Sequence, residues 1–195
     1  QPLPAVDSNL ANVHEIPLSR IEHLQGKPES LVGIEWLEAP VVDVNLQHGI
    51  LTVAAGKDFH LAVDQVVVFG TTFLGRVAEV HNDFSYIHLW SRAGVRTGVT
   101  IAGEQGTTEA VAIGRGLQGE AIVDWIKDEK VLEEGAAIFW RSRALDPPAL
   151  IDESFFLGAL DRSDGFLRGD DYYFLTHNFP ASAEGRVFVA ATAVG

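Results

Sequence analysis

His81, Asp83 and Ser85 bring the three residue types of a hydrolytic triad within five positions of each other. In a triad the serine attacks, the histidine accepts its proton and the aspartate orients the imidazole, so the three side chains must converge. Here Asn82 and Asp83 are turn-forming residues between two apolar runs. Side chains at alternate positions around a turn splay apart and cannot form this relay. The sequence therefore predicts a β-hairpin turn at this position rather than an active site.

Other catalytic or metal-binding patterns are weak. Cys is absent, and no two His residues have the spacing HxH or HxxxH of metal ligands. Asp170 and Asp171 have the chemistry of a cation site, but charged residues at the start of a strand are more often simply solvated. His60 and Asp64 are the best remaining catalytic pair, and an ordinary surface turn is the favoured interpretation. We expect no catalytic residue, no metal and no cofactor.

The acidic composition argues against two classes of partner. Lys and Arg total 14 against 27 Asp and Glu, which gives a formal net charge of −13. Binding along a nucleic-acid backbone, or to an anionic membrane surface, depends on clustered cations. We therefore expect no nucleic-acid partner. The sequence also lacks a run of about 18 apolar residues, so any link to a membrane is expected to come through an anchor absent from this chain.

Residues 1–38 are predicted to be a linker with a short helix. Leu18, Ile21 and Leu24 are spaced three apart, as on one face of a helix, but Pro17 interrupts the pattern. From residue 39 the chain changes to short apolar runs separated by Gly, Asn and Asp. We expect twelve strands, at 41–46, 50–55, 65–70, 73–80, 85–90, 98–103, 109–114, 120–125, 136–140, 155–160, 172–177 and 185–191.

Strands this closely spaced are typical of an all-β sandwich or barrel. A parallel sheet would need helical crossovers of a dozen or more residues, for which these runs leave almost no room. Twelve strands are too many for one small barrel, so the sequence predicts two β-barrel subdomains of six strands each. Gly75, inside the run 73–80, is expected to mark a bulge or a bend.

The stretch GILTVAAGKDFHLAVDQVVVFGTTFLGRVAEVHNDFSYIHLW resembles the rod shape-determining protein MreC family. Its pieces at 53–59, 63–69, 74–80 and 85–89 are similar, in order, to successive strand and turn motifs of that family. The later segments KVLEEGAAIF and PPALIDESFFLGAL are also similar to family segments in the same order. Ala136 stands after Gly135 where the family has Asp, and the upstream coiled coil of the family is reduced to the interrupted stripe at 10–24.

The resemblance implies two six-stranded barrels, similar to trypsin-like barrels without their catalytic residues, after a short N-terminal helical linker. In this arrangement residues 39–64 and 136–195 form one barrel, and 65–135 form a second barrel inserted into it; sequential barrels are the alternative. The resemblance further implies a non-enzymatic, self-associating scaffold on the extracytoplasmic or periplasmic face of the cytoplasmic membrane. Its implied partners are MreD, a transpeptidase and, indirectly, MreB.

Such a scaffold is expected to make protein contacts through exposed edge strands and aromatic patches. Core packing is the alternative role for any of these aromatics. Two other functions remain open: a two-barrel hydrolase with a site around His60 and Asp64, and a wall-glycan binding module that uses exposed Trp side chains. The candidate partner-binding residues are Trp90, Trp140, Phe155 and Tyr173.

Overall fold

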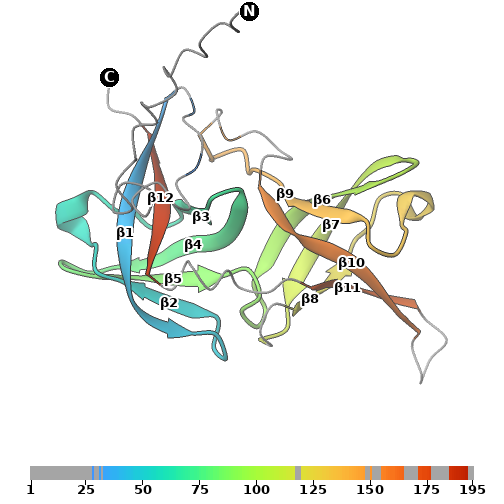
Figure 1. Ribbon diagram of the computed structural model, residues 1–195, viewed down its shortest axis with the longest axis horizontal. Helices are drawn as coiled ribbons and strands as arrows, with labels where there is room; N and C mark the ends of the chain where they lie inside the picture. The colour runs from blue at the N-terminus through green and yellow to red at the C-terminus, as the bar shows by residue number, and fades with distance from the viewer. Residues whose placement is uncertain are drawn as a thin grey trace, which may run out of the picture.

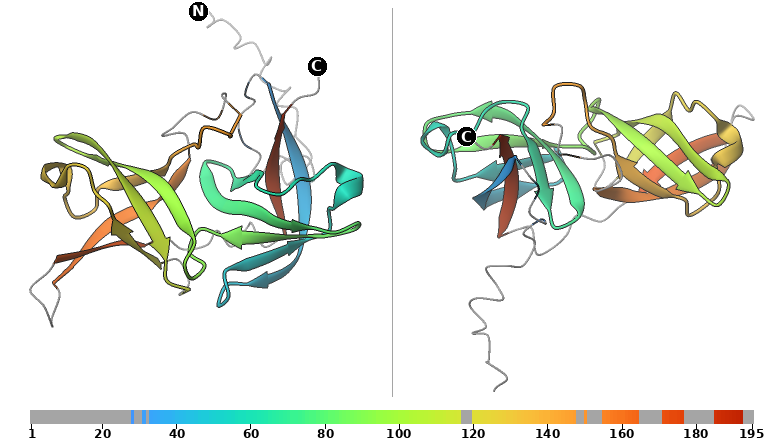
Figure 2. Two further views of the ribbon diagram at one scale, coloured as in Figure 1. Left: turned by 180° about the vertical axis from the view of Figure 1, so that it is seen from behind. Right: turned by 90° about the horizontal axis from the view of Figure 1, so that it is seen from above.

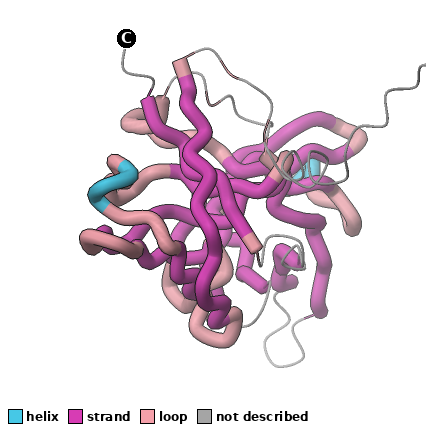
Figure 3. Tube along the Cα trace, turned by 60° about the vertical axis from the view of Figure 1, so that its left-hand side comes forward, coloured by secondary structure: helices cyan, strands magenta, loops and turns pink. Residues whose placement is uncertain are grey.

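The regular structure is almost entirely β (Figure 3). The computed structural model describes residues 28, 31, 33–116, 120–147, 150, 155–164, 171–176 and 185–192. Within them lie the short 3-10 helices η1 (Lys57–Phe59) and η2 (Glu129–Val131). The strands are β1 (Ile34–Asn45), β2 (Ile50–Val53), β3 (Val66–Phe69), β4 (Thr72–Val80), β5 (Ser85–Leu89), β6 (Arg96–Gly103), β7 (Gly106–Gly114), β8 (Glu120–Asp124), β9 (Ala137–Trp140), β10 (Phe156–Asp164), β11 (Asp171–Thr176) and β12 (Arg186–Thr192).

These strands close into two antiparallel barrels that lie side by side (Figures 1 and 2). The first barrel runs β1-β2-β5-β4-β3-β12 and closes where β12 pairs with β1. The second runs β6-β7-β8-β11-β10-β9 and closes where β9 pairs with β6. The predicted all-β fold with two six-stranded barrels is therefore confirmed, and each of the twelve predicted runs overlaps one strand.

The strand pairings give barrel boundaries that differ from the predicted ones. The strands β3, β4 and β5, expected in the inserted barrel, pair with β1, β2 and β12. The strands β9, β10 and β11, expected in the outer barrel, pair with β6, β7 and β8. The boundaries at 65 and 135 are wrong for these six strands, because the chain completes five strands of the first barrel before it leaves. It then builds the whole second barrel and returns as β12.

The first strand also begins earlier than expected. β1 starts at Ile34, inside the stretch 1–38 that was predicted to be a linker, and Ile34 pairs with Thr192 of β12. Glu35 and Glu38 are exposed on this strand, which explains why it does not have the apolar character of the others. The predicted helical stripe at 10–24 lies outside the described residues. Within the described ranges, no helix is long and apolar enough to cross a membrane.

Two clusters of buried side chains hold the barrels together. The cluster inside the first barrel includes Leu51, Val67 and Val189. The other cluster fills the second barrel but also takes in Val68 of β3 and Phe188 of β12. Successive residues on β3 and β12 therefore point into different clusters, as the two-residue period of a strand requires. These two strands are apolar on both faces because one face lines their own barrel and the other packs against the second barrel.

Gly75 sits at the irregular position predicted for β4. The register between β3 and β4 shifts there, since Val67 is opposite Gly75 and Val68 is opposite Phe73, which leaves Leu74 as an extra residue. On the other side Gly75 pairs with Leu89 of β5. A Cβ atom at Gly75 would overlap the carbonyl oxygen of His88, which is backbone and cannot move aside cheaply. The β4–β5 pairing therefore requires glycine at this position.

We predict that Gly75→Ala destabilises the protein by roughly 2 kcal/mol, because the added methyl group forces β4 and β5 apart. The measurement is the urea midpoint of unfolding at neutral pH. Gly98→Ala is the matched control, since Gly98 also lies inside a strand but its added Cβ would come no closer than 3.4 Å to any neighbouring atom, the nearest being in the Arg141 side chain. Equal midpoints for the two variants would contradict the close approach of β4 and β5.

Candidate functional site

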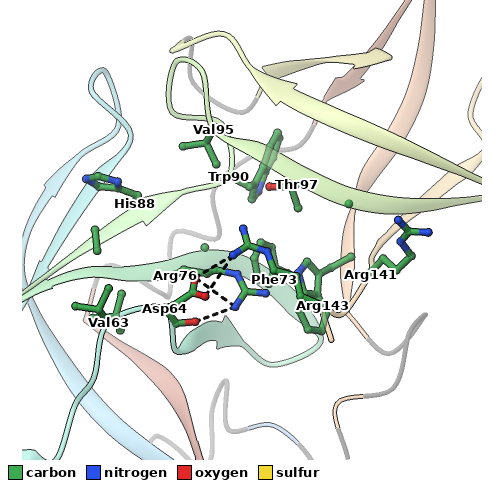
Figure 4. Close-up of a pocket in the computed structure, with 15 residues that line it drawn as sticks. Val63, Asp64, Phe73, Arg76, His88, Trp90, Val95, Thr97, Arg141 and Arg143 are labelled. Carbon is green, nitrogen blue, oxygen red and sulfur yellow. Dashed lines mark hydrogen bonds and ion pairs between the residues drawn. The ribbon is translucent and has the colours of Figure 1, made fainter. Parts of the chain in front are cut away.

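A cleft of about 300 Å³ lies between the two barrels (Figure 4). Strands β4 and β5 of the first barrel form one wall, through Phe73, Arg76 and His88. The other wall comes from β6 and from β9 with the segment after it, including Thr97 and Trp140. This volume is at the lower end of the range for ligand-binding cavities. The position between two rigid barrels makes the cleft the first candidate for a functional site.

The inner surface of the cleft is aromatic. Phe73 stacks on Trp140 with ring centroids 5.1 Å apart and an angle of 12° between the planes. Phe155 meets the other side of Trp140 edge-on at 6.0 Å. Phe73 and Arg76 are three residues apart and would face opposite sides of a regular strand, but the extra residue Leu74 brings both to the outside of the first barrel. The irregularity in β4 thus assembles this surface.

Arg76 is the centre of an ion-pair network across the cleft. Its guanidinium donates two hydrogen bonds of 2.7 Å to the two carboxylate oxygens of Asp146, which follows β9, and both side chains are almost buried. It donates a third, of 2.8 Å, to the backbone carbonyl of Asp64. Arg143 then donates to the Asp64 carboxylate at 3.0 Å. The guanidinium of Arg76 also lies 5.7 Å from the Trp140 ring. These contacts tie the first barrel to the segment leaving β9.

The ionisation of the cleft follows from these contacts. Burial by itself would raise the pKa of Asp146, but hydrogen bonds from the Arg76 side chain and the Arg143 backbone N–H outweigh burial and hold its pKa below the usual range. Burial, together with the nearby charge of Arg92, lowers the pKa of His88. His88 is therefore neutral at pH 7, while Asp146 is fully ionised and paired.

The structure confirms the predicted hairpin at the suggested triad. The turn joins β4 to β5, and the His81 N–H donates to the Phe84 carbonyl at 2.9 Å. Ser85 is fully buried and its hydroxyl donates to the Ala55 carbonyl at 2.7 Å. The His81 ring stacks on Phe84 and its Nε2 atom lies 3.6 Å from a Glu79 carboxylate oxygen. The side chains of Ser85 and His81 are therefore not arranged so that one could activate the other.

The remaining catalytic suggestions gain no support from the described residues. His60 and Asp64 both have positive φ, 57° and 74°, which places them in turns around η1. The Asp64 carboxylate is occupied by Arg143 and Arg76. Among the described residues, no three His, Asp or Glu side chains are grouped as metal ligands. Asp170 lies outside the described residues, so the suggested cation site there is not tested.

Three of the four predicted contact aromatics belong to the core. Trp90, Trp140 and Phe155 are only 5%, 1% and 4% exposed, so they cannot form a surface patch. The alternation of adjacent aromatics predicted one outward ring for Phe155 and Phe156, but Phe155 packs in the same cluster as Trp90 and Trp140, and the two Trp side chains line the cleft between the barrels. Tyr173 lies in β11 opposite Val123 of β8 and Arg162 of β10, and its side chain lies outside the described part. The expected open edge strands are also absent from both closed rings of described strands.

Of the residues that line the cleft, Asp64, Trp90 and Trp140 were singled out from the sequence, but Phe73 and Arg76 were not. One usable signal was Arg76, since an arginine inside the otherwise apolar run FLGRVAEV must either face solvent or find a carboxylate. Its partner Asp146 is 70 residues away in a loop, and no local pattern links the two. The cleft therefore depends on tertiary contacts that periodicity does not reveal.

The fold belongs to the class of proteins built from two paired six-stranded β-barrels. No protein-family model matches the sequence, and no curated protein sequence does either. Solved structures do match. MreC from Pseudomonas aeruginosa superposes with a TM-score of 0.64 at 14% identity, over 80% of this chain and 98% of that one. The major periplasmic domain of the cell shape-determining filament MreC gives 0.62 at 11% identity, over 85% and 100%.

A third match is a complex between penicillin-binding protein PBP2 and MreC from Helicobacter pylori. It has a TM-score of 0.56 and 14% identity, and covers 82% of this chain and 98% of the matched one. The chain thus has the double-barrel fold of MreC structures over nearly their full length. The resemblance to the MreC family noted in the sequence is confirmed at the level of the fold.

We predict that Asp146→Asn lowers the free energy of unfolding by about 2 kcal/mol at pH 7, because the charged Arg76 loses its paired carboxylate. The pKa of Asp146 is lowered in the folded state, so its contribution is fully present above the ordinary aspartate pKa and is lost as pH falls through the folded value. The stability difference between the two proteins should therefore shrink below about pH 4. Urea unfolding at a series of pH values measures it, and a pH-independent difference would contradict this assignment.

Proposed function

We propose that the chain is a non-enzymatic scaffold of the bacterial cell-shape and cell-wall elongation machinery. The observation that carries the proposal is the match of both barrels, in one arrangement, to MreC structures that include a complex with a transpeptidase. The organisation of the cleft supports it. Its arginines are held in pairs with Asp64, Asp146 and Glu109, and the described residues contain no group of three His, Asp or Glu side chains that could hold a metal ion.

The scaffold acts through protein contacts outside the cytoplasmic membrane. The periplasmic origin of matched domains supports this location, and an upstream anchor would hold the chain at the membrane face. The transpeptidase is its direct partner, by analogy with the PBP2 complex. Contacts to MreD, an indirect link to MreB and self-association complete the proposal, and all three follow from the family resemblance alone.

We infer that the transpeptidase binds at the rim of the cleft. Val63 lines the cleft and is 61% exposed, and Leu145 lies next to Asp146 and is 91% exposed. Exposed aliphatic side chains beside a fixed aromatic and arginine cluster suit the centre of a protein interface, where apolar contacts are surrounded by polar groups. Because both barrels are closed, the partner is bound through side chains and loops.

We predict that the double variant Val63→Asp/Leu145→Asp binds the elongation transpeptidase of the same cell at least about tenfold more weakly than the parent chain. Surface plasmon resonance with the immobilised transpeptidase ectodomain measures the affinity. Val42→Asp is the matched control, since Val42 is also 61% exposed but does not line the cleft. Undetectable binding of the parent chain would overturn the transpeptidase contact, and equal loss in the control would move the contact away from the cleft.

Self-association is tested separately by sedimentation equilibrium over a range of concentrations. A scaffold that assembles with itself should show a mass that rises with concentration, and should assemble more strongly when additional N-terminal residues are present. The second comparison separates association through the barrels from association through the upstream segment. A strict monomer in both forms would contradict the self-association part of the proposal while leaving the transpeptidase contact intact.

A further inference from the structure

Trp125 is held on the surface of the second barrel in an unusual conformation. It is 69% exposed, whereas Trp90 and Trp140 are buried and Trp36 is half-buried. Its φ is 55°, a left-handed conformation that is uncommon for a bulky residue and stores backbone strain. The Asp124 carboxylate accepts a 2.7 Å hydrogen bond from the Trp125 N–H and helps to fix this turn. The fold thus holds a large aromatic ring out in solvent.

The ring forms one wall of a hollow on the outer face of β6 and β7. The hollow has a volume of about 180 Å³ and is lined by Trp125, Arg96, Gly98, Val111 and Ile113. The Arg96 guanidinium lies 5.7 Å from the centre of the indole ring and supports it. On the floor, Gly98 of β6 pairs with Val111 of β7. The hollow lies where Gly98 has no side chain, and a Cβ built there would touch only the Arg141 side chain, at 3.4 Å.

The same face continues into a polar groove. Two residues farther along the strands, Thr100 pairs with Glu109, and these residues line a second, wider hollow of about 410 Å³. Its other lining residues include Thr107, Lys127 and Arg141. Positions two apart on a strand share a face and lie roughly 7 Å apart. The apolar hollow at Trp125 and the polar groove at Glu109 are therefore adjacent parts of one surface.

The charges of the polar groove neutralise one another. Glu109 forms close ion pairs with Lys127 on one side and Arg141 on the other. Hydrogen bonds from these two side chains lower the pKa of Glu109, which keeps it ionised at neutral pH. Asp128 also lines the groove, so its two cations, Lys127 and Arg141, face two carboxylates and the lining carries no net charge. A neutral ligand with many hydroxyl groups can use these side chains as hydrogen-bond donors and acceptors.

A peptide strand is a poor fit to this surface. β6 is paired with β9 and β7, and β7 is paired with β6 and β8, so the backbone groups under the groove are already hydrogen-bonded. Addition of an extended peptide to a sheet requires an open edge. The ligand must therefore be recognised by the side chains of this surface. They provide a flat indole ring, threonine hydroxyl groups and a balanced set of charged groups.

We propose that this surface binds a neutral oligosaccharide. The apolar C–H face of one pyranose ring stacks on Trp125 in the space left by Gly98, and the hydroxyl groups of the next ring hydrogen-bond to Glu109, Arg141 and Thr107. A pyranose has this combination of an apolar face and a polar rim, and an exposed indole offers the complementary apolar surface. The site adjoins the cleft between the barrels, with which it shares Gly98 and Arg141 as lining residues, while Trp125 itself lies outside that cleft.

The test is a titration of the purified chain with chitotetraose, cellotetraose and maltotetraose, without any protein partner. At least one should bind saturably, change the tryptophan fluorescence and protect it from quenching by acrylamide, because Trp125 is the most exposed of the four indoles. Trp125→Ala should weaken that binding at least about tenfold, and Trp125→Phe should retain part of it. Phe59→Ala is the matched control, since Phe59 is 54% exposed but belongs to the first barrel, and it should bind as the parent does.

Gly98→Val provides a second variant that leaves Trp125 in place. The valine side chain suits a strand and fills the floor of the hollow, so it should abolish saccharide binding while the urea midpoint stays near that of the parent. The proposal is overturned if none of the three saccharides binds, or if Trp125→Ala binds as tightly as the parent. Loss of transpeptidase binding in Trp125→Ala, with no saccharide bound by the parent, would instead make Trp125 a protein-binding residue.

Discussion

The first barrel can close only when β12 enters the gap between β1 and β3. Residues 34–89 supply five of its six strands, but the sixth, Arg186–Thr192, follows the entire second barrel. Phe188 is the register partner of both Glu38 on β1 and Val68 on β3, so a single short strand completes two pairings. Because this contact joins distant parts of the chain, the first barrel depends on prior or simultaneous folding of the second, and slow, cooperative folding is expected.

The closing strand also fixes how the two barrels meet. Val187 and Val189 point into the first barrel, whereas Phe188 and Ala190 join the cluster shared with the second. The Phe73–Trp140 stack and the Arg76–Asp146 pair then extend this contact to the surface. A buried ion pair such as Arg76–Asp146 adds little to stability by itself, because both charges lose their hydration. Its bidentate geometry, however, fixes the position of β4 relative to the segment after β9. The cleft therefore has a defined shape, as a docking surface requires.

Local features of the chain were predictable, and the partners of each strand were not. Alternating apolar residues gave all twelve strands, Asn82–Asp83 gave the hairpin turn, and Gly75 gave the irregularity in β4. The assignment of strands to barrels failed because antiparallel strands with similar apolar faces contain no local sequence feature that identifies the strands with which they pair. The same limitation explains Trp90: alternation shows that one side of a strand is apolar, but it cannot show that a second barrel buries the opposite side. Nor could it foresee that Trp125, at a strand end, would be the exposed indole.

Closure of both barrels restricts how such a protein can bind a partner or a ligand. A sheet with a free edge can bind partners through its backbone, with little dependence on side chains, and risks indiscriminate association. Here the paired rings of described strands leave no such edge, so recognition falls to side chains displayed on rigid strands. The cleft at Arg76 is lined by β4, β5 and the end of β9, the groove at Trp125 by β6 and β7, and the two surfaces meet at Gly98 and Arg141. Because both surfaces are built on rigid strands and adjoin each other, the protein can present two ligands in a fixed relation, which is the physical requirement for a scaffold.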